Sequence, residues 1–271
     1  MFKHLVLRLI PRPLLLMLKK QHYYRVLKDV EAGAEPELEV VKGILRTGDV
    51  AIDIGANMGL YTVAMSRWVG SGGKVYSIEP IPDTFELLTS STRRLGLANV
   101  ETFRMALSDR EDVLKMVVPK YNGGGENYYR AHLTSDAGEI GADGLMTIEV
   151  KVHPLDEIST AWRTPVRFIK CDVEGHERKV IKGAERLIAK CKPACLVEIS
   201  GDPDDRSSPA AEIVNYFEGL GYGTYLLVSH CLKKRQAGEH AVNYFFLMPK
   251  HVGELGKVAP QLVEGIRGET E

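Results

Sequence analysis

The feature that most constrains the fold is a regular alternation of short apolar runs with longer segments of helical character, which begins at Glu31 and continues to Leu220. Glycine, proline and polar clusters separate these segments, as turns do between strands and helices. The expected strands are Val50–Ile54, Lys74–Ile78, Val100–Ala106, Val166–Cys171 and Ala194–Ile199, and the expected helices are Glu31–Leu45, Gly59–Val69, Asp83–Leu95, Glu177–Ala189 and Ala210–Leu220. This alternation predicts an α/β fold with helices on both faces of a mostly parallel sheet.

The end of the chain departs from the alternation. Two late strands, Thr224–Val228 and Val242–Met248, follow each other without a helix between them, so we expect an antiparallel hairpin there. Residues 111–118 and 147–152 form a further pair of expected strands, which flank a glycine-rich insertion. The predicted architecture is therefore a doubly wound, mostly parallel seven-stranded sheet with a C-terminal antiparallel hairpin.

Composition divides the chain into three parts. They are a basic, apolar N-terminal segment at 1–30, a single domain at 31–250 with an inserted loop at 119–146, and a polar, frayed tail at 251–271. Charges and prolines between Arg8 and Pro13 interrupt the apolar run near the start, so it is too broken to span a membrane and lacks a signal-peptide cleavage site. Residues 1–28 either pack on the protein itself or on a second subunit, or contact an anionic membrane surface peripherally.

Charge and cysteine content exclude several classes of protein. Thirty-five basic and 36 acidic residues leave a net charge of -1, so no overall positive field favours nucleic acid as a partner. The four cysteines lack the spacing of a zinc site or a disulfide framework, and such a sparse set is typical of thiols in a reducing compartment. We therefore expect a cytoplasmic protein, for which a homo-oligomer is compatible with the sequence.

The stretch VAIDIGANMG, residues 50–59, places two glycines between the first expected strand and its helix. Gly55 and Gly59 let the backbone turn tightly and expose amide groups at a helix N-terminus. Ligands of such sheets bind at the carboxyl ends of the strands. Glu79 ends the next strand, 26 positions after Asp53, where a carboxylate can accept hydrogen bonds from a ribose diol. The sequence therefore predicts a nucleoside site at this turn.

A dinucleotide is the rival ligand. Its fingerprint is G-x-G-x-x-G, whereas this chain has G-x-x-x-G with Asn57 in place of the middle glycine. Asp53, directly before the turn, would repel a phosphate and attract an ammonium or sulfonium group. Both differences favour a positively charged nucleoside cofactor over NAD.

Four motifs resemble those of the FkbM-type methyltransferases, a branch of the class I S-adenosylmethionine-dependent enzymes with a Rossmann-like fold. They are GDVAIDIGANMGLYT, GGKVYSIEPIPDTFELL, NVETFRMALSD and VRFIKCDVEGHERKVIKGAERLI, between Gly48 and Ile188. The resemblance implies S-adenosylmethionine as cofactor, S-adenosylhomocysteine as product, Glu79 on the ribose, and Ala106 to Asp109 near the adenine. The implied cofactor residues are Asp53, Gly55, Ala56, Asn57, Gly59, Tyr61, Glu79, Pro80, Ala106, Leu107, Ser108 and Asp172.

The motif IKCDVEGHE crowds charge at the end of the fourth strand, where burial without a role would be costly. Candidate catalytic residues are Lys170, Asp172, Glu174 and His176. Asp172 or Glu174 is the favoured general base, with His176 as the alternative; Lys170 could instead hold the loop by pairing with a carboxylate. These acids could also collect a divalent ion with Glu198, but the sequence lacks the Asp…Asp-Asn set of metal-dependent catechol-type enzymes, so we expect no metal.

The insertion is expected to shape the acceptor pocket, with a loop that contacts nothing as the alternative. Its amide and aromatic side chains suit a sugar or polyol, and the predicted acceptor contacts are Asn122, Asn127, Tyr128, Tyr129 and Glu198. The expected function is an O-methyltransferase acting on a hydroxyl of a small natural product, a saccharide or a glycolipid. The alternatives are an NAD-dependent oxidoreductase and a non-catalytic scaffold.

Overall fold

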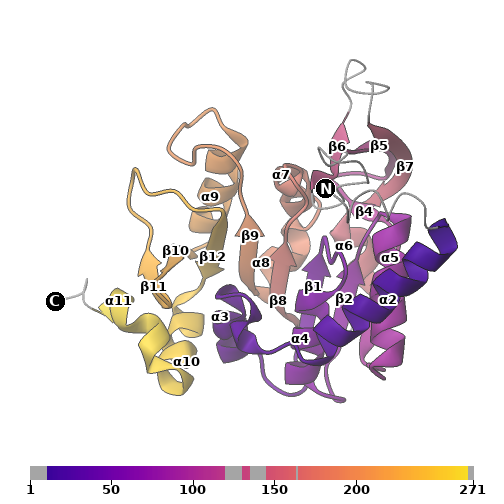
Figure 1. Cartoon of the computed structure of the whole chain (residues 1–271). Helices are drawn as coiled ribbons and strands as arrows, with labels where there is room; N and C mark the ends of the chain where they lie inside the picture. Colours follow the sequence, from indigo (N-terminus) through magenta and orange to yellow (C-terminus); the bar gives the residue numbers. More distant parts are fainter. Residues whose placement is uncertain (1–10, 120–129, 135–144, 163, 268–271) are drawn as a thin grey trace, which may run out of the picture.

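A computed structural model describes residues 11–119, 130–134, 145–162 and 164–267 of the chain. In this part of the chain the strands form an eight-stranded sheet, in the order β11-β10-β12-β9-β8-β1-β2-β3, and a four-stranded sheet, in the order β4-β7-β5-β6 (Figure 1). The large sheet contains β1 (Val50–Ile54), β2 (Lys74–Ile78), β3 (Val100–Phe103), β8 (Val166–Cys171), β9 (Ala194–Glu198), β10 (Gly223–Val228), β11 (Cys231–Lys234) and β12 (Asn243–Leu247).

The strands from β3 to β9 run parallel, and β12, β10 and β11 are antiparallel to their neighbours. The winding reverses at β1, because the chain continues to β2 and β3 on one side and later to β8 and β9 on the other. The carboxyl ends of β1 and β8 therefore flank the topological switch point, where ligands of such sheets bind. The predicted α/β, mostly parallel sheet with antiparallel late strands is confirmed.

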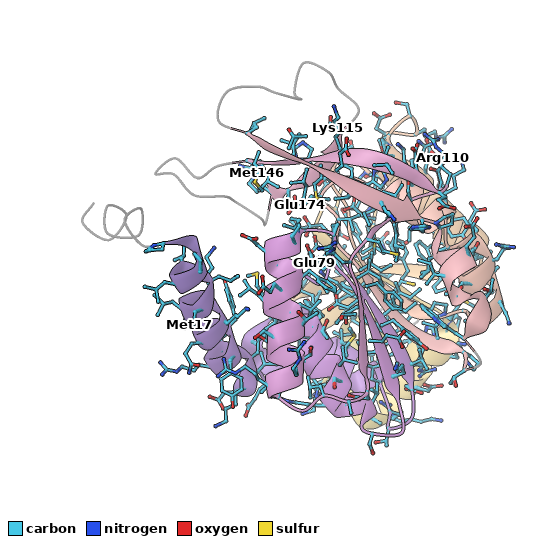
Figure 2. All side chains as sticks on the ribbon, turned by 90° about the vertical axis from the view of Figure 1, so that its right-hand side faces the viewer. Met17, Glu79, Arg110, Lys115, Met146 and Glu174 are labelled. Atoms are coloured by element: carbon cyan, nitrogen blue, oxygen red, sulfur yellow. The ribbon has the colours of Figure 1, made fainter. Side chains whose placement is uncertain are left out.

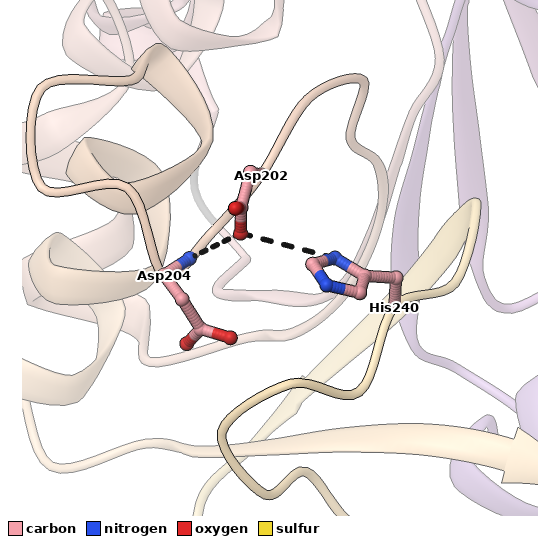
Figure 3. Close-up of side chains that lie close together, drawn as sticks. All are labelled: Asp202, Asp204 and His240. Carbon is pink, nitrogen blue, oxygen red and sulfur yellow. Dashed lines mark hydrogen bonds and ion pairs between the residues drawn. The ribbon is translucent and has the colours of Figure 1, made fainter.

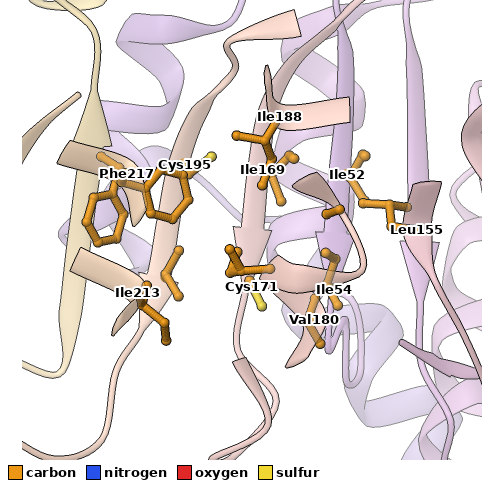
Figure 4. Packing of buried hydrophobic residues seen from close by; sticks show 14 of the residues in the cluster. Ile52, Ile54, Leu155, Ile169, Cys171, Val180, Ile188, Cys195, Ile213 and Phe217 are labelled. Carbon is orange, nitrogen blue, oxygen red and sulfur yellow. The ribbon is translucent and has the colours of Figure 1, made fainter. Parts of the chain in front are cut away.

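Helices cover both faces of the large sheet. On one face pack α3 (Glu37–Ile44), α4 (Leu60–Val69) and α10 (Pro249–Val258), and on the other α6 (Leu155–Ile158), α7 (Glu177–Lys182), α8 (Glu185–Cys191) and α9 (Pro209–Gly219). Figure 4 shows part of the second layer, where Ile52 and Ile169 of the strands lie among Val180, Ile188 and Phe217 of the helices. All five residues of β1 are buried, as expected for a central strand covered on both faces.

The small sheet is built around the two strands that were predicted to flank the insertion. It contains β4 (Ala106–Leu107), β5 (Asp112–Val118), β6 (His132–Thr134) and β7 (Met146–His153), and β5 pairs antiparallel with β7 along its whole length. Its buried side chains pack against Ile81, which begins the helix α5 (Pro82–Arg94) after β2. The small sheet thus lies beside the carboxyl ends of the large sheet.

The prediction of seven strands was wrong by one, because β11 was missed. Cys231–Lys234 is short and polar, and it pairs with β10 at the edge of the sheet. The connecting residues Ser229 and His230 have φ values of +48° and +64°, as in the two-residue hairpin turns that favour asparagine and glycine. The hairpin is therefore β10–β11, and β12 lies between β9 and β10.

Three other predicted boundaries were wrong. The helix predicted from Glu31 begins at Glu37, after the short 3-10 helix η1 (Ala32–Ala34), because Glu35 precedes a proline and is extended, as a residue before proline prefers. The strand predicted to Ala106 ends at Phe103, and Ala106 belongs to the small sheet. The helix predicted from Glu177 breaks at Gly183, where a Cβ would lie 2.0 Å from the carbonyl oxygen of Ser108.

The predicted frayed tail is helical as far as Arg267. It forms α10, the 3-10 helix η4 (Pro260–Val263) and α11 (Glu264–Arg267). His251, Leu255 and Leu262 are buried against the layer that contains α3 and α4. Their spacing is helical but sparse, and polar residues between them hide the pattern in the sequence.

The helix α2 (Arg12–Lys28) is the described part of the N-terminal segment, and it packs against α5 (Figures 1 and 2). Lys20 pairs with Glu86 of α5 at 2.5 Å, and the guanidinium of Arg94 lies 4.0 Å from the ring centroid of Tyr24. The predicted alternative of packing on the protein's own body is therefore confirmed for α2. None of the helices in the described ranges has the length and apolar character needed to cross a bilayer.

Candidate active site

The turn after β1 is pressed against the neighbouring strand ends. Gly55 and Gly59 have φ values of +73° and +98°, which glycine adopts without steric cost. The amides of Gly55 and Ala56 both donate to the carbonyl oxygen of Ile78 at 3.0 Å. A Cβ on Gly55 would lie 1.8 Å from the carbonyl oxygen of Asp172. The first glycine is therefore required by the close approach of the β1–α4 and β8–α7 loops.

Glu79 follows β2 and fixes the turn from the other side. Its Oε2 accepts a hydrogen bond from the amide of Asn57 at 2.9 Å, and its Oε1 accepts from the amide of Ile81 at 2.9 Å and from Oγ1 of Thr84 at 2.7 Å. Burial raises the pKa of Glu79, and these hydrogen bonds oppose the rise. The carboxylate of Glu79 therefore fixes the position of the glycine turn relative to the start of α5.

Two buried charges lie below the turn, Asp53 with 0% of its surface exposed and Lys170 with 7%. Asp53 Oδ2 accepts from Oγ1 of Thr62 at 2.6 Å. Lys170 Nζ donates to Oδ2 of Asp172 at 2.9 Å and to the carbonyl oxygen of Gly55 at 3.2 Å. Burial acts to lower the pKa of Lys170, but the Asp172 and Asp53 carboxylates raise it above its ordinary value. Lys170 is therefore a fixed cation that positions Asp172, in agreement with the loop-holding alternative.

A cavity of about 210 Å³, the main cavity, lies between the strand ends of the large sheet and the small sheet. Figure 2 shows Glu79 and Glu174 in this region. Polar groups of the large sheet form one wall, and apolar side chains from the small sheet and from the start of α5 form the other. The lining residues are Ile54, Gly55, Asn57, Ile78, Glu79, Pro80, Ile81, Ala106, Leu107, Met116, Ala131, Leu133, Asp172, Val173, Glu174, His176 and Glu198.

Three carboxylates of the main cavity form one acidic group. Asp172, Glu174 and Glu198 each place an oxygen within 4.8 Å of the others. Burial and the neighbouring Asp172 and Glu174 raise the pKa of Glu198 to about 7, with Lys170 acting in the opposite direction. Burial and the charges of Asp172 and Glu177 also raise the pKa of Glu174. Because like charges resist joint ionisation, this group is suited to hold a proton near neutral pH.

His176 lines the same cavity and is engaged with the small sheet. Its Nε2 shares a hydrogen bond of 3.0 Å with Oγ of Ser108. Burial and Lys179 lower the pKa of His176 to about 4, against the opposite effect of Asp109. The ring is therefore neutral at pH 7, and its contact with Ser108 fixes it at the cavity wall.

A second cavity, the side cavity, encloses about 330 Å³ on the α2 side of the glycine turn. It shares Gly55, Asn57 and Asp172 with the main cavity. The two cavities therefore meet at the turn. The lining residues are Tyr23, Val26, Leu27, Glu35, Gly55, Ala56, Asn57, Met58, Leu60, Tyr61, Lys170 and Asp172.

The structure brings together most of the residues that the sequence singled out. Gly55, Asn57, Glu79, Pro80, Ala106, Leu107, Asp172, Glu174, His176 and Glu198 line the main cavity, and Ala56, Tyr61 and Lys170 line the side cavity. Asp53, Gly59 and Ser108 line neither cavity, so Asp53 acts on the turn through Thr62 and Lys170 rather than at the cavity surface. Asn122, Asn127, Tyr128 and Tyr129 lie outside the described residues.

Sequence reasoning missed the apolar wall of the main cavity and Glu35 in the side cavity. Met116, Val117 and Val118 are all buried at the end of β5, after a more exposed first half, a pattern that marks a covered strand end but not a cavity wall. Glu35 belongs to no motif and comes close to the turn only through folding of the segment between α2 and α3. No signal in the sequence could have found it.

A second group of side chains, two aspartates and a histidine, lines neither cavity. The side chains of Asp202, Asp204 and His240 lie close together (Figure 3), and all three residues are exposed. Asp204 pairs with Arg235 at 2.6 Å and accepts a hydrogen bond from the amide of Gly238 at 2.7 Å. These contacts tie two loops together, and we assign this group a structural role.

The strand order, the reversal of winding at β1 and the glycine turn define a Rossmann-like α/β fold with a cavity at the carboxyl ends of its strands. A family described as "Methyltransferase FkbM domain" matches residues 53–223. The chain belongs to the FkbM methyltransferase family. The resemblance stated from the motifs is thereby confirmed.

Individual relatives align with only part of this chain. Hexuronic acid methyltransferase AglP of Haloferax volcanii is 28% identical over 175 residues, which cover 62% of this chain and 65% of that protein. Protein-L-isoaspartate O-methyltransferase of Methanocella arvoryzae is 34% identical over 59 residues, 22% of this chain and 31% of that one. A crystal structure of methyltransferase FkbM from Methylobacillus flagellatus gives a TM-score of 0.48 at 16% identity and covers 79% of this chain and 51% of that one. The matches thus span less than two thirds of these relatives' own lengths.

Proposed function

We propose that the protein transfers the methyl group of S-adenosylmethionine to a hydroxyl group of a saccharide, which is either free or part of a glycolipid or other small natural product. The observation that carries the proposal is the meeting of Glu79, the bare backbone at Gly55 and the acidic group in one cavity. The similarity to a hexuronic acid methyltransferase supports a saccharide among these acceptors.

The residues present fit the cofactor. Asn57 Oδ1 is buried and has no hydrogen-bond partner among the described residues, so a ligand donor can satisfy it. Glu79 Oε2 accepts a hydrogen bond from the amide of Asn57, and a carboxylate oxygen can accept a second from a ribose hydroxyl. Ala106 and Leu107 line the apolar side of the cavity and would contact the adenine. When bound, the cofactor supplies an electrophilic methyl group on a sulfonium.

The chain's own residues then have to hold the acceptor hydroxyl in line and remove its proton. Asp172, whose carboxylate is fixed by Lys170, and Glu174 are placed to orient the hydroxyl. The proton passes to the acidic group, where Glu198 has a pKa of about 7, the value best matched to a base at neutral pH. His176 is held by Ser108 and contributes to the shape of the cavity.

Calorimetric titration tests the cofactor assignment. S-adenosylhomocysteine is expected to bind the wild-type protein and NAD is not. Glu79→Gln is expected to weaken S-adenosylhomocysteine binding about tenfold or more, because a ribose hydroxyl loses a charged acceptor. The control Glu101→Gln changes an exposed carboxylate that pairs with Lys74 on the neighbouring strand and should leave affinity unchanged. Binding of NAD in place of S-adenosylhomocysteine would favour the oxidoreductase, and binding of neither would favour the scaffold.

Transfer of radiolabelled methyl groups tests the acceptor class. The protein is incubated with labelled S-adenosylmethionine and with saccharides, glycolipids, amines and carboxylic acids in parallel. Label is expected on a saccharide hydroxyl, and Asp172→Asn is expected to lower turnover while S-adenosylhomocysteine still binds. Labelling of amines or carboxylates alone would contradict the assignment of a hydroxyl acceptor.

The exposed part of α2 supports a peripheral contact with an anionic membrane. Its first turns expose Leu14, Met17 and Leu18, and 58% of Met17 is accessible. Figure 2 labels Met17 on this helix. The helix carries five basic residues and no acidic one, in a chain whose net charge is -1. Apolar side chains that are flanked by basic residues can insert at the boundary between the headgroups and the acyl chains of an anionic membrane. The same charge disfavours pairing of α2 with a second copy of itself.

Co-sedimentation with vesicles tests this contact. The protein is expected to bind vesicles of phosphatidylcholine with phosphatidylglycerol, and to stay in solution with phosphatidylcholine alone. The double variant Met17→Ser with Leu18→Ser should lose the binding, whereas the control Val113→Ser, which alters an exposed apolar side chain on β5, should keep it. Equal binding of both variants would refute a role for α2.

A further inference from the structure

A third cavity, the rear cavity, encloses about 240 Å³ at the amino end of β8. It is lined by Val166, the first residue of β8, whereas the main cavity is lined by Asp172, which directly follows the last one. The six residues of β8 span about 20 Å, so the rear cavity lies at the opposite edge of the sheet from the main cavity. Its other lining residues are Asp156, Ser159, Thr160, Trp162, Thr164, Pro165, Arg186, Leu187, Lys190 and Cys191.

The charged groups of the rear cavity favour an anion. Arg186 and Lys190 are one turn apart on α8, so their side chains lie on the same face of the helix. Asp156 is the carboxylate of the cavity, and its oxygens accept from the amides of Arg186 at 2.9 Å and Leu187 at 2.8 Å. Within the described ranges no carboxylate pairs with the exposed ammonium of Lys190. An anionic ligand can therefore pair with Lys190.

Two hydroxyl groups of the cavity are oriented as hydrogen-bond acceptors. Oγ1 of Thr160 donates to the carbonyl oxygen of Glu157 at 2.9 Å, and Oγ of Ser159 donates to the carbonyl oxygen of Asp156 at 3.5 Å. A hydroxyl group has one proton to donate, so each of these oxygens is left to accept from a ligand. Hydroxyl groups on the ligand are the matching donors.

Trp162 adds an apolar surface with a fixed orientation. Its indole stacks on the ring of Tyr76 in β2, with 3.8 Å between the ring centroids and 1° between the planes. Trp162 is only partly buried and lines the cavity. An aromatic ring of this kind suits the apolar C–H face of a sugar. The cavity thus combines an apolar surface, acceptors for hydroxyl groups and a positive charge.

We propose that the rear cavity binds an anionic monosaccharide, a single sugar ring that carries a phosphate or a carboxylate. The anionic group pairs with Lys190 and Arg186, and the ring packs beside Trp162. The hydroxyl groups of the sugar donate to Thr160 and Ser159. A cavity of about 240 Å³ suits one ring, because it is smaller than the sites of most drug-sized ligands. No step of the proposed methyl transfer uses this cavity, so its ligand is bound whether or not the main cavity is catalytic.

Indole fluorescence measures this binding. Trp68 and Trp162 are the two tryptophans of the chain, so Trp68→Phe leaves Trp162 as the single reporter. The probes are glucose 6-phosphate and glucuronic acid, with glucose and inorganic phosphate to supply the ring and the anion alone. One of the two anionic sugars is expected to bind about tenfold or more tightly than glucose and phosphate, and the one that does so identifies the anionic group. Equal affinity for inorganic phosphate would mean a simple anion site and would overturn the proposal.

Lys190→Gln tests the contact with the anion. It is expected to weaken the anionic sugar about fivefold or more, because the charge opposite the anion is lost, and to leave the affinity for glucose unchanged. Lys257→Gln is the matched control, since Lys257 is also an exposed lysine in the last turn of a helix, α10. It should change neither affinity. An unchanged affinity in Lys190→Gln, or an equal loss in both variants, would contradict the assignment.

Alkylation of Cys191 gives a readout that does not depend on fluorescence. Cys191 lines the rear cavity, and Cys231 on β11 is partly exposed in the same way. The anionic sugar at about ten times its Kd is expected to slow the reaction of Cys191 with iodoacetamide about fivefold or more, and to leave Cys231 unchanged, as measured by mass spectrometry. If neither the alkylation of Cys191 nor the fluorescence of Trp162 responds to either anionic sugar, the rear cavity is not the proposed site.

Discussion

Single residues decide how closely the two loops of the site approach each other, and Gly55 is the clearest case. Gly55→Ala places a Cβ 1.8 Å from the carbonyl oxygen of Asp172 at a φ of +73°. We expect a loss of about 3 kcal/mol or more in the free energy of unfolding, from the left-handed backbone and from the overlap together. S-adenosylhomocysteine affinity should fall with it. Urea titration and calorimetry measure the two effects.

The matched control for this prediction is Gly96→Ala. Gly96 has a φ of +70° with nothing within 4 Å of the added Cβ, so it carries the backbone cost without the overlap. We expect a loss of about 1–2 kcal/mol and unchanged ligand affinity. Equal losses in both variants would show that the contact with Asp172 is unimportant.

Glu198 links the acidic group to the pH dependence of stability. Its pKa in the folded protein is about 7 and its ordinary value is 4.5, so the folded state binds the proton more tightly than the unfolded chain. The stabilisation from this group is complete below pH 4.5 and is lost as the pH rises through 7. Glu198→Gln keeps a neutral side chain at all pH values. It should therefore raise the Tm by about 2 °C at pH 8, a small value because the group is half exposed.

At pH 4 Glu198→Gln should have the same Tm as the wild type, because Glu198 is then mostly protonated in both the folded and the unfolded state. Glu101→Gln, on the exposed side of β3, is the control and should show no such difference between the two pH values. Methyl transfer by Glu198→Gln should fall at both. A Tm of Glu198→Gln that is lower than that of the wild type at pH 8 would mean that the Glu198 carboxylate is stabilising, and would contradict the repulsion expected within the acidic group.

Among the elements of the fold, the C-terminal end of α2 is tied to α4 by one side chain. The guanidinium of Arg67 on α4 donates to the carbonyl oxygens of Leu27 at 3.1 Å, Lys28 at 2.7 Å and Val30 at 2.6 Å. It thereby satisfies carbonyl groups at the C-terminus of the helix, where a cation is favourable.

Arg67→Gln is expected to release the C-terminal end of α2 while the sheet stays folded. Cleavage by a protease within residues 28–36 should become about tenfold faster, since the local opening loses roughly 1–2 kcal/mol of stabilisation. Mass spectrometry of the fragments identifies the site. Arg93→Gln, an exposed arginine of α5, is the control. Unchanged cleavage in Arg67→Gln would contradict the role of this arginine.

The strands and helices differ in how well the sequence predicts them. β1, β2 and β8 were predicted with their exact bounds, because each is a short run of mostly apolar residues between turn residues. β11 was missed because an edge strand needs no apolar run and its turn lacks glycine. The tail helix α10 was missed because its buried side chains, His251 and Leu255, are too few to give a clear period.

At the scale of the whole molecule, the sequence could predict the site residues that follow the parallel strands. It could not predict the site residues that other segments contribute. Glu79, Asp172 and Glu198 end or follow parallel strands, and parallel strands bring their carboxyl ends to one edge of the sheet. Glu35 and Met116 reach the cavities through the packing of α2 and of the small sheet. Those contacts depend on distant segments, which a local pattern does not encode.

The main cavity is built from both sheets, so a bound ligand should stabilise the molecule as a whole. Glu79 and Asp172 belong to the large sheet, and Met116 and Leu133 to the small one. A ligand at about 100 times its Kd adds about 2.7 kcal/mol to the free energy of unfolding. For a chain of this size that corresponds to a rise in Tm of about 5–10 °C.

S-adenosylhomocysteine is expected to give that rise in a thermal shift assay, and NAD at the same concentration none. Hydrogen exchange should then show protection in β5 of the small sheet as well as in the glycine turn, because the ligand bridges the two. Protection confined to the glycine turn would mean that the small sheet does not close on the cofactor. A shift with NAD alone would mean that the acids around the turn tolerate a diphosphate, which their charge and burial argue against.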